Sequence, residues 1–194
     1  MEDRLAAAAG AIRHRELVVY PTETVYGLGA DALDTEAIDR VFDAKRRARE
    51  ESLSLAVPSV DAAMAYVQAG TRARDCMDAF LPGPVTVICE KAPIVPDELT
   101  GGLDCVGVRV PDHELALALL ERAAPITATS ANVSGRGSVT RVADLDPEIE
   151  AAVAVVLDGG ETTGTASTVV DPERGEILRR GAMADQVEAW LDSR

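Results

Sequence analysis

The chain has 194 residues, of which 47% are hydrophobic and 3% aromatic, so we expect one domain over residues 1–194 with an aliphatic core. Its formal net charge is −14, from 33 acidic residues against 19 Lys and Arg. This charge argues against a broad nucleic-acid surface, because phosphate backbones need basic patches.

No apolar run is long enough to cross a membrane, and no secretory signal, disulfide framework or cysteine-based metal motif is visible. We therefore predict a cytoplasmic protein without membrane contact. Lys45 and Lys91 are the only lysines, and the other cations are arginines. A surface so acidic and so poor in lysine fits adaptation to high salt, so we also predict a halophilic source.

Hydrophobic periodicity and turn residues predict helices that alternate with strands, a pattern typical of α/β proteins. In chain order, the predicted helices cover residues 4–15, 35–44, 60–68, 73–80, 112–123, 144–152 and 185–191. The predicted strands cover residues 17–20, 53–57, 85–89, 105–110, 125–129, 153–157 and 176–181, and residues 164–170 form a loop that enters a strand. Glycine and proline place loops at residues 21–31, 81–84 and 93–102.

Two of these connections are rich in small polar side chains. Residues 127–135 pass from an apolar run into hydroxyls and one amide, and residues 21–31 follow a strand with hydroxyls and glycines. In α/β sheets ligands favour the crevice beyond strand ends, where hydroxyls and free N–H groups suit phosphate oxygens. The alternative is that both are ordinary turns or helix caps.

Two cationic features point to anions. Residues 45–49 are the densest positive cluster in the chain, and they form either an anion site or a surface cluster that neutralises a helix C-terminus. Arg109 interrupts an apolar strand, and alternation places it on one face with Cys105 and Gly107. A buried arginine needs an anion, either a structural ion pair or a ligand carboxylate.

His14 and His113 are the only histidines and neither is in a cluster, so we do not predict Ser-His-Asp or Cys-His catalysis. The remaining polar set is Thr22, Ser130, Ser138, Ser167, Asn132, Lys45, Arg47, Arg109 and Arg179. Such a set binds anions and stabilises charge at phosphorus, which is most of what phosphoryl and nucleotidyl transfer require. The residues alone therefore predict a site for a phosphate-bearing ligand and a carboxylate.

Seven motifs, in order along nearly the whole chain, resemble those of the YrdC family. They are YPTETVYGLG (20–29), KRR (45–47), PGPVT (82–86), VRVPDH (108–113), SANVSG (130–135), STV (167–169) and LRRG (178–181). The resemblance implies a nucleotidyltransferase that makes threonylcarbamoyl-adenylate and pyrophosphate from L-threonine, bicarbonate and ATP. It also implies an α/β fold, with a twisted mixed sheet and helices around a large concave cleft, and a role in modifying adenosine 37 of tRNA.

The resemblance implies catalytic roles for Lys45, Arg47, Ser130 and Asn132. It implies ATP contacts for Arg47, Glu51, Cys105, Ser130, Ser138 and Arg179. It implies threonine contacts for Thr22, Arg109, Ala128 and Ser167. It implies Mg²⁺ as well, and because the sequence shows no dedicated carboxylate pair, we expect the phosphates to supply most metal ligands and the protein to provide no metal site.

Two positions depart from the family pattern. Glu51 occupies a nucleotide-contacting position where its charge would repel phosphate, and Ala56 stands where some relatives have a histidine near threonine. Two other functions remain open: an RNA-binding module that uses the concave face, and a carbamoyl-transfer domain. For a synthase we expect downstream threonylcarbamoyl-transfer machinery as a partner, and weak or indirect contact with tRNA.

Overall fold

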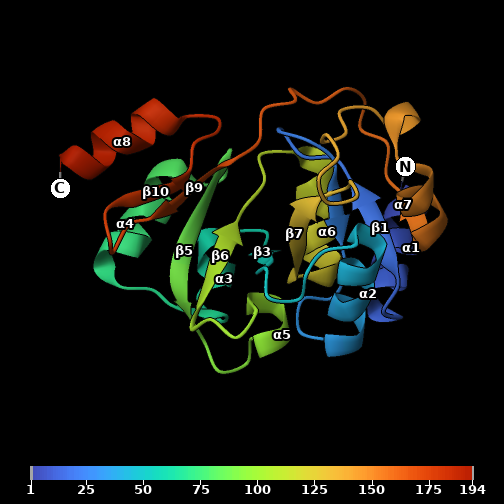
Figure 1. The fold of residues 1–194 in the computed structure, drawn as a ribbon, viewed down its shortest axis with the longest axis horizontal. Helices are drawn as coiled ribbons and strands as arrows, with labels where there is room; N and C mark the ends of the chain where they lie inside the picture. The colour runs from blue at the N-terminus through green and yellow to red at the C-terminus, as the bar shows by residue number, and fades with distance from the viewer. Residues whose placement is uncertain (1, 194) are drawn as a thin grey trace.

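The structure, a computed structural model, describes residues 2–193 and shows a ten-stranded twisted mixed sheet with helices on both sides (Figure 1). The helices are α1 (Glu2–Arg13), α2 (Thr35–Lys45), α3 (Val60–Ala63), α4 (Thr71–Phe80), α5 (Asp97–Thr100), α6 (Glu114–Ala123), the 3-10 turn η1 (Val142–Asp144), α7 (Pro147–Ala152) and α8 (Ala184–Asp192). The strands are β1 (Leu17–Tyr20), β2 (Gly27–Gly29), β3 (Ser54–Ala56), β4 (Val67–Gln68), β5 (Val85–Lys91), β6 (Cys105–Arg109), β7 (Ile126–Ser130), β8 (Val153–Val156), β9 (Thr168–Asp171) and β10 (Glu176–Arg179). The predicted fold class is confirmed.

Strands distant in sequence lie side by side in the sheet. The order is β10-β9-β5-β6-β3-β7-β2-β1-β8, and β4 pairs with the outer part of β5. The pairs β1–β8, β3–β6 and β5–β9 are parallel, and the others are antiparallel. This topology brings the ends of β6, β7 and β10 close to one surface, although about 70 residues separate the first from the last.

The predicted helix over residues 60–68 is wrong. The helix ends at Ala63, and Val67 and Gln68 pair with Lys91 and Glu90 as the short strand β4. The sheet therefore overrides helical periodicity, because pairing with β5 satisfies backbone groups of residues 67–68 that a longer helix would have used.

Three further boundaries differ from prediction. The predicted loop over residues 93–102 contains α5, and α7 starts at Pro147 because Asp146 caps it by accepting a hydrogen bond from the Glu148 N–H. The predicted loop over residues 21–31 contains β2, whose two glycines conceal it because glycine is uncommon in strands. Glycine is required there: a Cβ at Gly27 would lie 2.8 Å from the Tyr20 ring.

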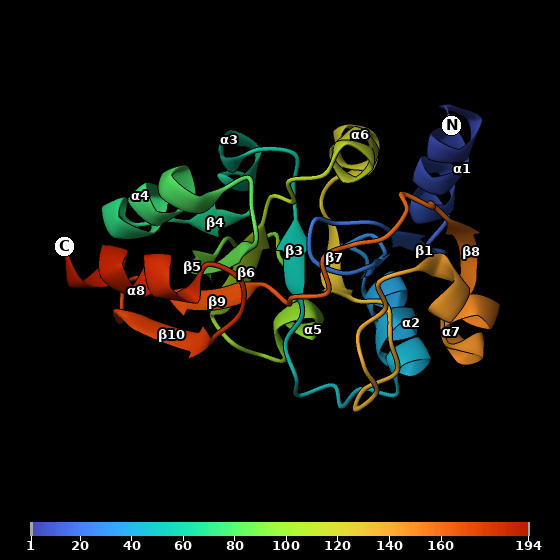
Figure 2. The ribbon, with the colours of Figure 1, turned by 90° about the horizontal axis from the view of Figure 1, so that it is seen from above.

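Two aliphatic clusters hold the layers together. The smaller joins α1 and α6 to β1 through Leu5, Ile12, Val18 and Leu119, and the larger packs the remaining helices on the sheet. Figure 2 shows α1, α3 and α6 on one side of the strands and α2, α5 and α7 on the other. None of the helices within residues 2–193 combines the length and apolarity needed to span a bilayer.

Candidate active site

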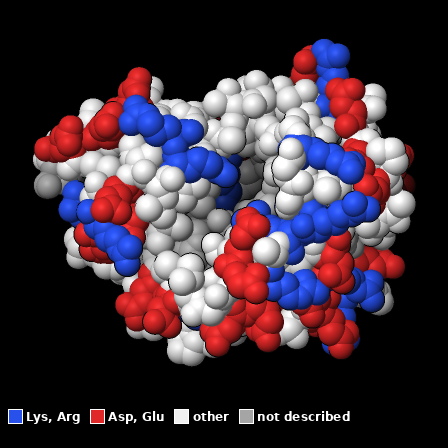
Figure 3. All heavy atoms as spheres, viewed as in Figure 1, with Lys and Arg blue, Asp and Glu red and all other residues white. Residues whose placement is uncertain are grey.

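A cavity of about 550 Å³ lies over the sheet and receives side chains from ten segments of the chain. Figure 3 shows that this face is hollowed at its centre and that Lys and Arg side chains border the hollow. The lining residues that had been predicted as site residues are Thr22, Arg47, Cys105, Arg109, Ala128, Ser130, Ser138, Ser167 and Arg179. The separate polar loops and strand ends therefore meet in one place.

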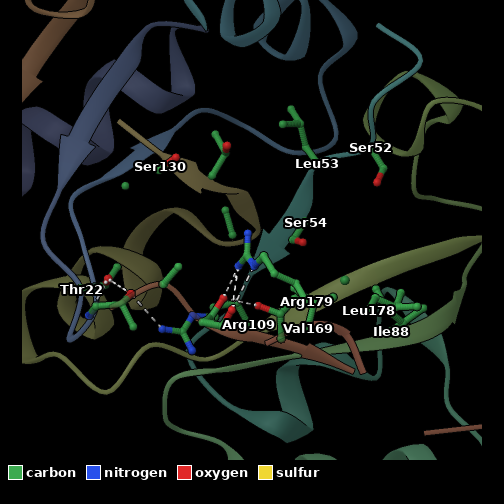
Figure 4. A pocket seen from close by; sticks show the side chains of 18 of the residues that line it. Thr22, Ser52, Leu53, Ser54, Ile88, Arg109, Ser130, Val169, Leu178 and Arg179 are labelled. Atoms are coloured by element: carbon green, nitrogen blue, oxygen red, sulfur yellow. Dashed lines mark hydrogen bonds between the residues drawn. The ribbon is translucent and has the colours of Figure 1, made fainter. Parts of the chain in front are cut away.

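The cavity is polar at one end and apolar at the other. Figure 4 shows Thr22 and Ser130 at one end, Arg109 and Arg179 between the ends, and Ile88 and Leu178 at the other end. Leu103, Cys105 and Val169 also line the cavity. A ligand that fits this arrangement has a flat or apolar group at one end and anionic groups at the other.

Within residues 2–193, four arginines line the cavity: Arg174, which is paired with Asp171, and three that come from other elements. Arg47 follows α2, Arg109 ends β6 and Arg179 ends β10. Burial lowers the pKa of the Arg179 guanidinium, and the positive charges of Arg109 and Arg47 lower it further. These like charges lie close enough to repel one another, so an anion placed among them is stabilised by all three.

Arg109 is a buried ion-pair member as well as a lining residue. Its guanidinium lies 2.6 Å from Glu23 and donates to the carbonyl oxygens of Gly83 and Val85, with side-chain exposures of 6% for Arg109 and 17% for Glu23. Burial lowers the pKa of Arg109, and the charge of Glu23 raises it. The structural ion pair that was one alternative for this arginine is present, and the predicted strand face is confirmed because Cys105 and Gly107 also line the cavity.

The loop after β1 is fixed by its own hydroxyls. The Thr22 hydroxyl donates to the Val25 carbonyl (2.6 Å), accepts from the Thr24 and Val25 N–H groups, and lies 2.8 Å from the Thr24 hydroxyl. Arg109 donates to the Thr24 hydroxyl at 3.4 Å. The loop is therefore a hydroxyl-stabilised turn, and it also forms part of the cavity wall.

Lys45 and Asn132 lie behind the wall, not in it. The Lys45 ammonium donates to the carbonyl oxygens of Ser130 and Asn132, and the Asn132 side-chain amide donates to the carbonyls of Val133 and Arg136. Neither residue lines the cavity. Burial, and secondarily the charge of Arg47, lower the pKa of Lys45 to about 8, against the opposing charge of Glu51.

The two departures from the family pattern also lie outside the cavity wall. Glu51 is exposed, with its carboxylate 3.4 Å from the Arg47 Nε, an ion pair without the alignment of a hydrogen bond. Ala56 is buried in β3 beside Arg109 of β6. A side chain larger than Ala56 at this position would extend toward the cluster that joins α1 and α6.

Sequence reasoning missed several polar lining residues. Ser54 and Thr86 each interrupt an apolar strand, and the Thr86 hydroxyl lies 3.1 Å from that of Ser167. Arg179 in turn donates to the Ser167 hydroxyl at 2.8 Å. A hydroxyl between apolar neighbours in a buried strand, as in Leu-Ser-Leu and Val-Thr-Val, was the signal available. At Gly107 a Cβ would lie 2.4 Å from the Ser54 Oγ, so the glycine keeps the floor open.

Metal ligands are sparse in the part of the chain that the structure describes. No three His, Cys, Asp or Glu side chains lie together as a metal-binding group within residues 2–193. Asp171 is the acidic residue among the cavity-lining side chains, and its carboxylate is 3.4 Å from Arg174. The residues present do not fit a metal site made by the protein itself.

Comparisons with known proteins agree on one family. The family model Sua5_yciO_yrdC, described as "Telomere recombination", matches residues 10–181. Over 173 residues the chain is 42% identical to the threonylcarbamoyl-AMP synthase of Pyrococcus abyssi, covering 88% of this chain and 51% of that protein. It is 33% identical to the threonylcarbamoyl-AMP synthase of Shigella boydii, covering 92% of this chain and 96% of that one.

A solved structure gives the same result. The crystal structure of P. abyssi Sua5 complexed with L-threonine superposes with a TM-score of 0.89 at 39% identity, over 96% of this chain and 58% of that chain. The chain thus spans about half the length of the P. abyssi relative and nearly all of the Shigella relative.

Proposed function

The chain belongs to the Sua5_yciO_yrdC family, and from that premise we propose that it is an L-threonylcarbamoyladenylate synthase. In this proposal L-threonine, bicarbonate and ATP give threonylcarbamoyl-AMP, pyrophosphate and water. The curated relatives named threonylcarbamoyl-AMP synthase and the relative complexed with L-threonine support it. The enzyme is then a nucleotidyltransferase, and we place its reaction in the cytoplasm.

One observation carries the proposal: Arg47, Arg109 and Arg179 meet in a single cavity beside hydroxyl-bearing loops. The apolar end around Ile88 and Leu178 suits a nucleobase. Cys105, Ser130 and Ser138 also line the cavity, and we propose that the two serines face the phosphates, whose charge the arginines would neutralise. Thr22, Ala128 and Ser167, with Arg109, are proposed to hold threonine, with Arg109 facing its carboxylate.

The chemistry proceeds in two balanced steps. First, the threonine amine attacks the carbon of bicarbonate, an N–C bond forms, and water leaves to give a carbamate. Next, a carbamate oxygen attacks the α-phosphorus of ATP, the bond to the β-phosphate oxygen breaks, and pyrophosphate leaves. Arg47 and Arg179 stabilise the charge that develops on the phosphate oxygens, and the Ser130 hydroxyl orients them. Lys45 and Asn132 complete the proposed catalytic set from behind the wall.

Mg²⁺ is proposed to accompany ATP as part of the substrate. Because the described residues form no carboxylate cluster around the cavity, the phosphate oxygens and water would supply its ligands. Glu51 does not line the cavity and is paired with Arg47. Its proposed role is therefore to orient the Arg47 side chain, and its charge does not face the phosphates.

Downstream, the mixed anhydride would pass to a threonylcarbamoyl transferase that modifies adenosine 37 of tRNA. We propose that the chain's own contact with tRNA is weak or indirect. Two exposed arginines are already paired: Arg136 with Asp146 and Glu148, and Arg141 with Glu161. Paired arginines give little net positive charge for a phosphate backbone.

Pyrophosphate release in omission experiments tests the proposal. The complete mixture of L-threonine, bicarbonate, ATP and Mg²⁺ should release pyrophosphate and form threonylcarbamoyl-AMP, detected by mass spectrometry. Each mixture lacking one of the three substrates should release none. Release without threonine, or no release from the complete mixture, would contradict the proposal.

A further inference from the structure

Three consecutive cations diverge at the end of α2. Lys45 is the last helical residue, Arg46 has a left-handed backbone (φ 50°), and the chain then turns toward the cavity. The side chain of Arg46 extends to Glu148 on the surface, whereas Arg47 lines the cavity. The left-handed turn thus separates three neighbouring positive charges into an internal, an external and a cavity-facing position.

Lys45 is joined to the loop of residues 130–134 from both its side chain and its backbone. Its ammonium donates to the carbonyls of Ser130 and Asn132, and its own carbonyl accepts from the Ser134 N–H at 2.8 Å. Lys45 is only 2% exposed and does not line the cavity. Ser130, at the start of the same loop, does line it (Figure 4).

We propose that Lys45 is a positioning residue, which fixes the loop of residues 130–134 so that the Ser130 hydroxyl faces the nucleotide, and that Lys45 itself does not contact the phosphates. The identity of that nucleotide rests on the proposed function, whereas the contacts of Lys45 with the loop are independent of that function.

The energetics favour this division of roles. A charged donor contributes more to a buried carbonyl than a neutral one does, and a buried carbonyl that loses its donor costs about 1–3 kcal/mol. The carbonyls of Ser130 and Asn132 take two of the three Lys45 N–H donors, and Lys45 does not line the cavity, so moving its ammonium to a phosphate there would weaken both bonds. Arg47 has no such constraint, because its guanidinium makes one backbone hydrogen bond, to Ser52, and lies on the cavity wall.

Amide hydrogen exchange tests the positioning role without any substrate. In Lys45→Met, which keeps the apolar stem and removes the donor, the Asn132 and Ser134 amides should exchange at least about tenfold faster than in the wild type. Arg46→Met is the matched control, because it removes the adjacent cation without touching the loop, and its exchange there should be unchanged. Unchanged exchange in Lys45→Met would overturn the proposal.

Nucleotide binding tests the absence of phosphate contact. Calorimetry with ATP and AMP, both without metal, gives the ratio of their dissociation constants for each variant. Lys45→Met should keep the wild-type ratio within about twofold, whereas Arg47→Met should lower the preference for ATP about tenfold, as expected when a charged contact to the extra phosphates is lost. An equal loss of preference in both variants would overturn the proposal.

The two experiments fail separately. If the wild type binds neither nucleotide, the proposed function fails, while the exchange comparison still decides the role of Lys45. If Lys45→Met does not fold, Lys45→Gln, which retains a donor on a shorter stem, takes its place. In Lys45→Gln the Asn132 and Ser134 amides should exchange faster than in the wild type, but by less than if the donor were removed altogether. If these amides exchange no faster than in the wild type while the preference for ATP is lost, the proposal is again overturned.

Discussion

The guanidinium of Arg109 holds two carbonyl groups and one carboxylate while its side chain also lines the cavity. This double role explains how a charge is tolerated in an apolar strand. Glu23 balances the charge, and the carbonyls of Gly83 and Val85 satisfy the donors. The same contacts fix the position of the arginine before any ligand binds.

A double-mutant cycle on this pair measures its structural part. Arg109→Gln should lower the free energy of unfolding by about 3 kcal/mol, because Glu23, which is partly buried, is left unpaired. Glu23→Gln should lower the free energy of unfolding less in the Arg109→Gln background than in the wild type, since the carboxylate that it removes no longer has a partner there. Urea unfolding of the four proteins is the measurement, and additive effects would contradict a coupled pair.

The pH dependence of stability should report Lys45. Its pKa falls from 10.5 in the unfolded chain to about 8 in the folded protein, mainly through burial. Between these values the unfolded chain binds a proton that the folded protein does not, so the contribution of Lys45 to stability rises with pH in that window and is constant below it. From pH 7.5 to 10 the increase should be roughly 2 kcal/mol.

Lys45→Met isolates this contribution from cysteines and tyrosines that titrate in the same range. The difference in unfolding free energy, wild type minus variant, should increase from pH 7.5 to 10. Denaturant unfolding at four pH values is sufficient. A flat or decreasing difference would show that Lys45 is not buried as the structure places it.

The sequence predicted which residues belong to the site better than it predicted which of them line the cavity and which lie behind its wall. Alternation along residues 105–110 identified the correct face for Arg109, because a strand has only two faces. The position of Lys45 behind the wall depends on the left-handed turn at Arg46 and on a loop 85 residues away. Neither can be inferred from the spacing of residues 45 and 47.

At the scale of the elements, a threonine side chain of β7 bonds to the backbone at the end of the glycine-containing strand β2. The Thr127 hydroxyl donates to the Leu28 carbonyl (3.0 Å) and accepts from the Ala30 N–H (3.1 Å), and Thr127 is fully buried. Strand pairing at Leu28 opposite Thr129 resumes as an isolated bridge between Asp31 and Ile126, and the two side-chain bonds fasten the segment between these points. Gly27, at the start of β2, lines the cavity, so the same bonds help to hold that part of the cavity wall in place.

Thr127→Val, nearly isosteric, should lower the free energy of unfolding by about 1–3 kcal/mol, because it leaves a buried donor and a buried acceptor unpaired. Thermal or urea unfolding measures this. Thr71→Val at an exposed position is the control and should change stability by less than about 0.5 kcal/mol. Equal effects at the two positions would mean that the Thr127 hydrogen bonds contribute nothing.

Helices with a repeating apolar face could be predicted from the sequence, whereas short strands that depend on backbone pairing with other strands could not. The predicted helices at residues 35–44 and 112–123 match α2 and α6 within about two residues, since an apolar face repeats along each. Strands β2 and β4 carry no pattern of their own. They exist because β1 and β7, or β5, supply backbone partners from elsewhere in the chain.

At the scale of the whole molecule, charge dominates solution behaviour. With a net charge of −14, repulsion among carboxylates should destabilise the fold at low ionic strength, and salt screens it. We predict that the midpoint of thermal unfolding rises as KCl increases from 0.1 to 2 M. Near pH 4.5, the sequence pI, the effect should shrink. A midpoint that falls with KCl at pH 7 would contradict the halophilic interpretation.

The fold class and family were accessible from motif order, because seven motifs along the chain are far more specific than any one. The depth of the cavity and the polarity of its two ends were not. They arise from the twist that brings β10 beside β9 and β5, opposite β7 and β2, and this arrangement becomes visible only when the strands are ordered in space (Figure 1).

A crystal structure of the chain with a non-hydrolysable ATP analogue and L-threonine tests the account most directly. We predict that both ligands occupy the one cavity, with the triphosphate between Arg47 and Arg179, the nucleobase near Ile88 and Leu178, and the threonine carboxylate at Arg109. Nucleotide bound on another face, or a triphosphate that none of the three arginines contacts, would contradict the account.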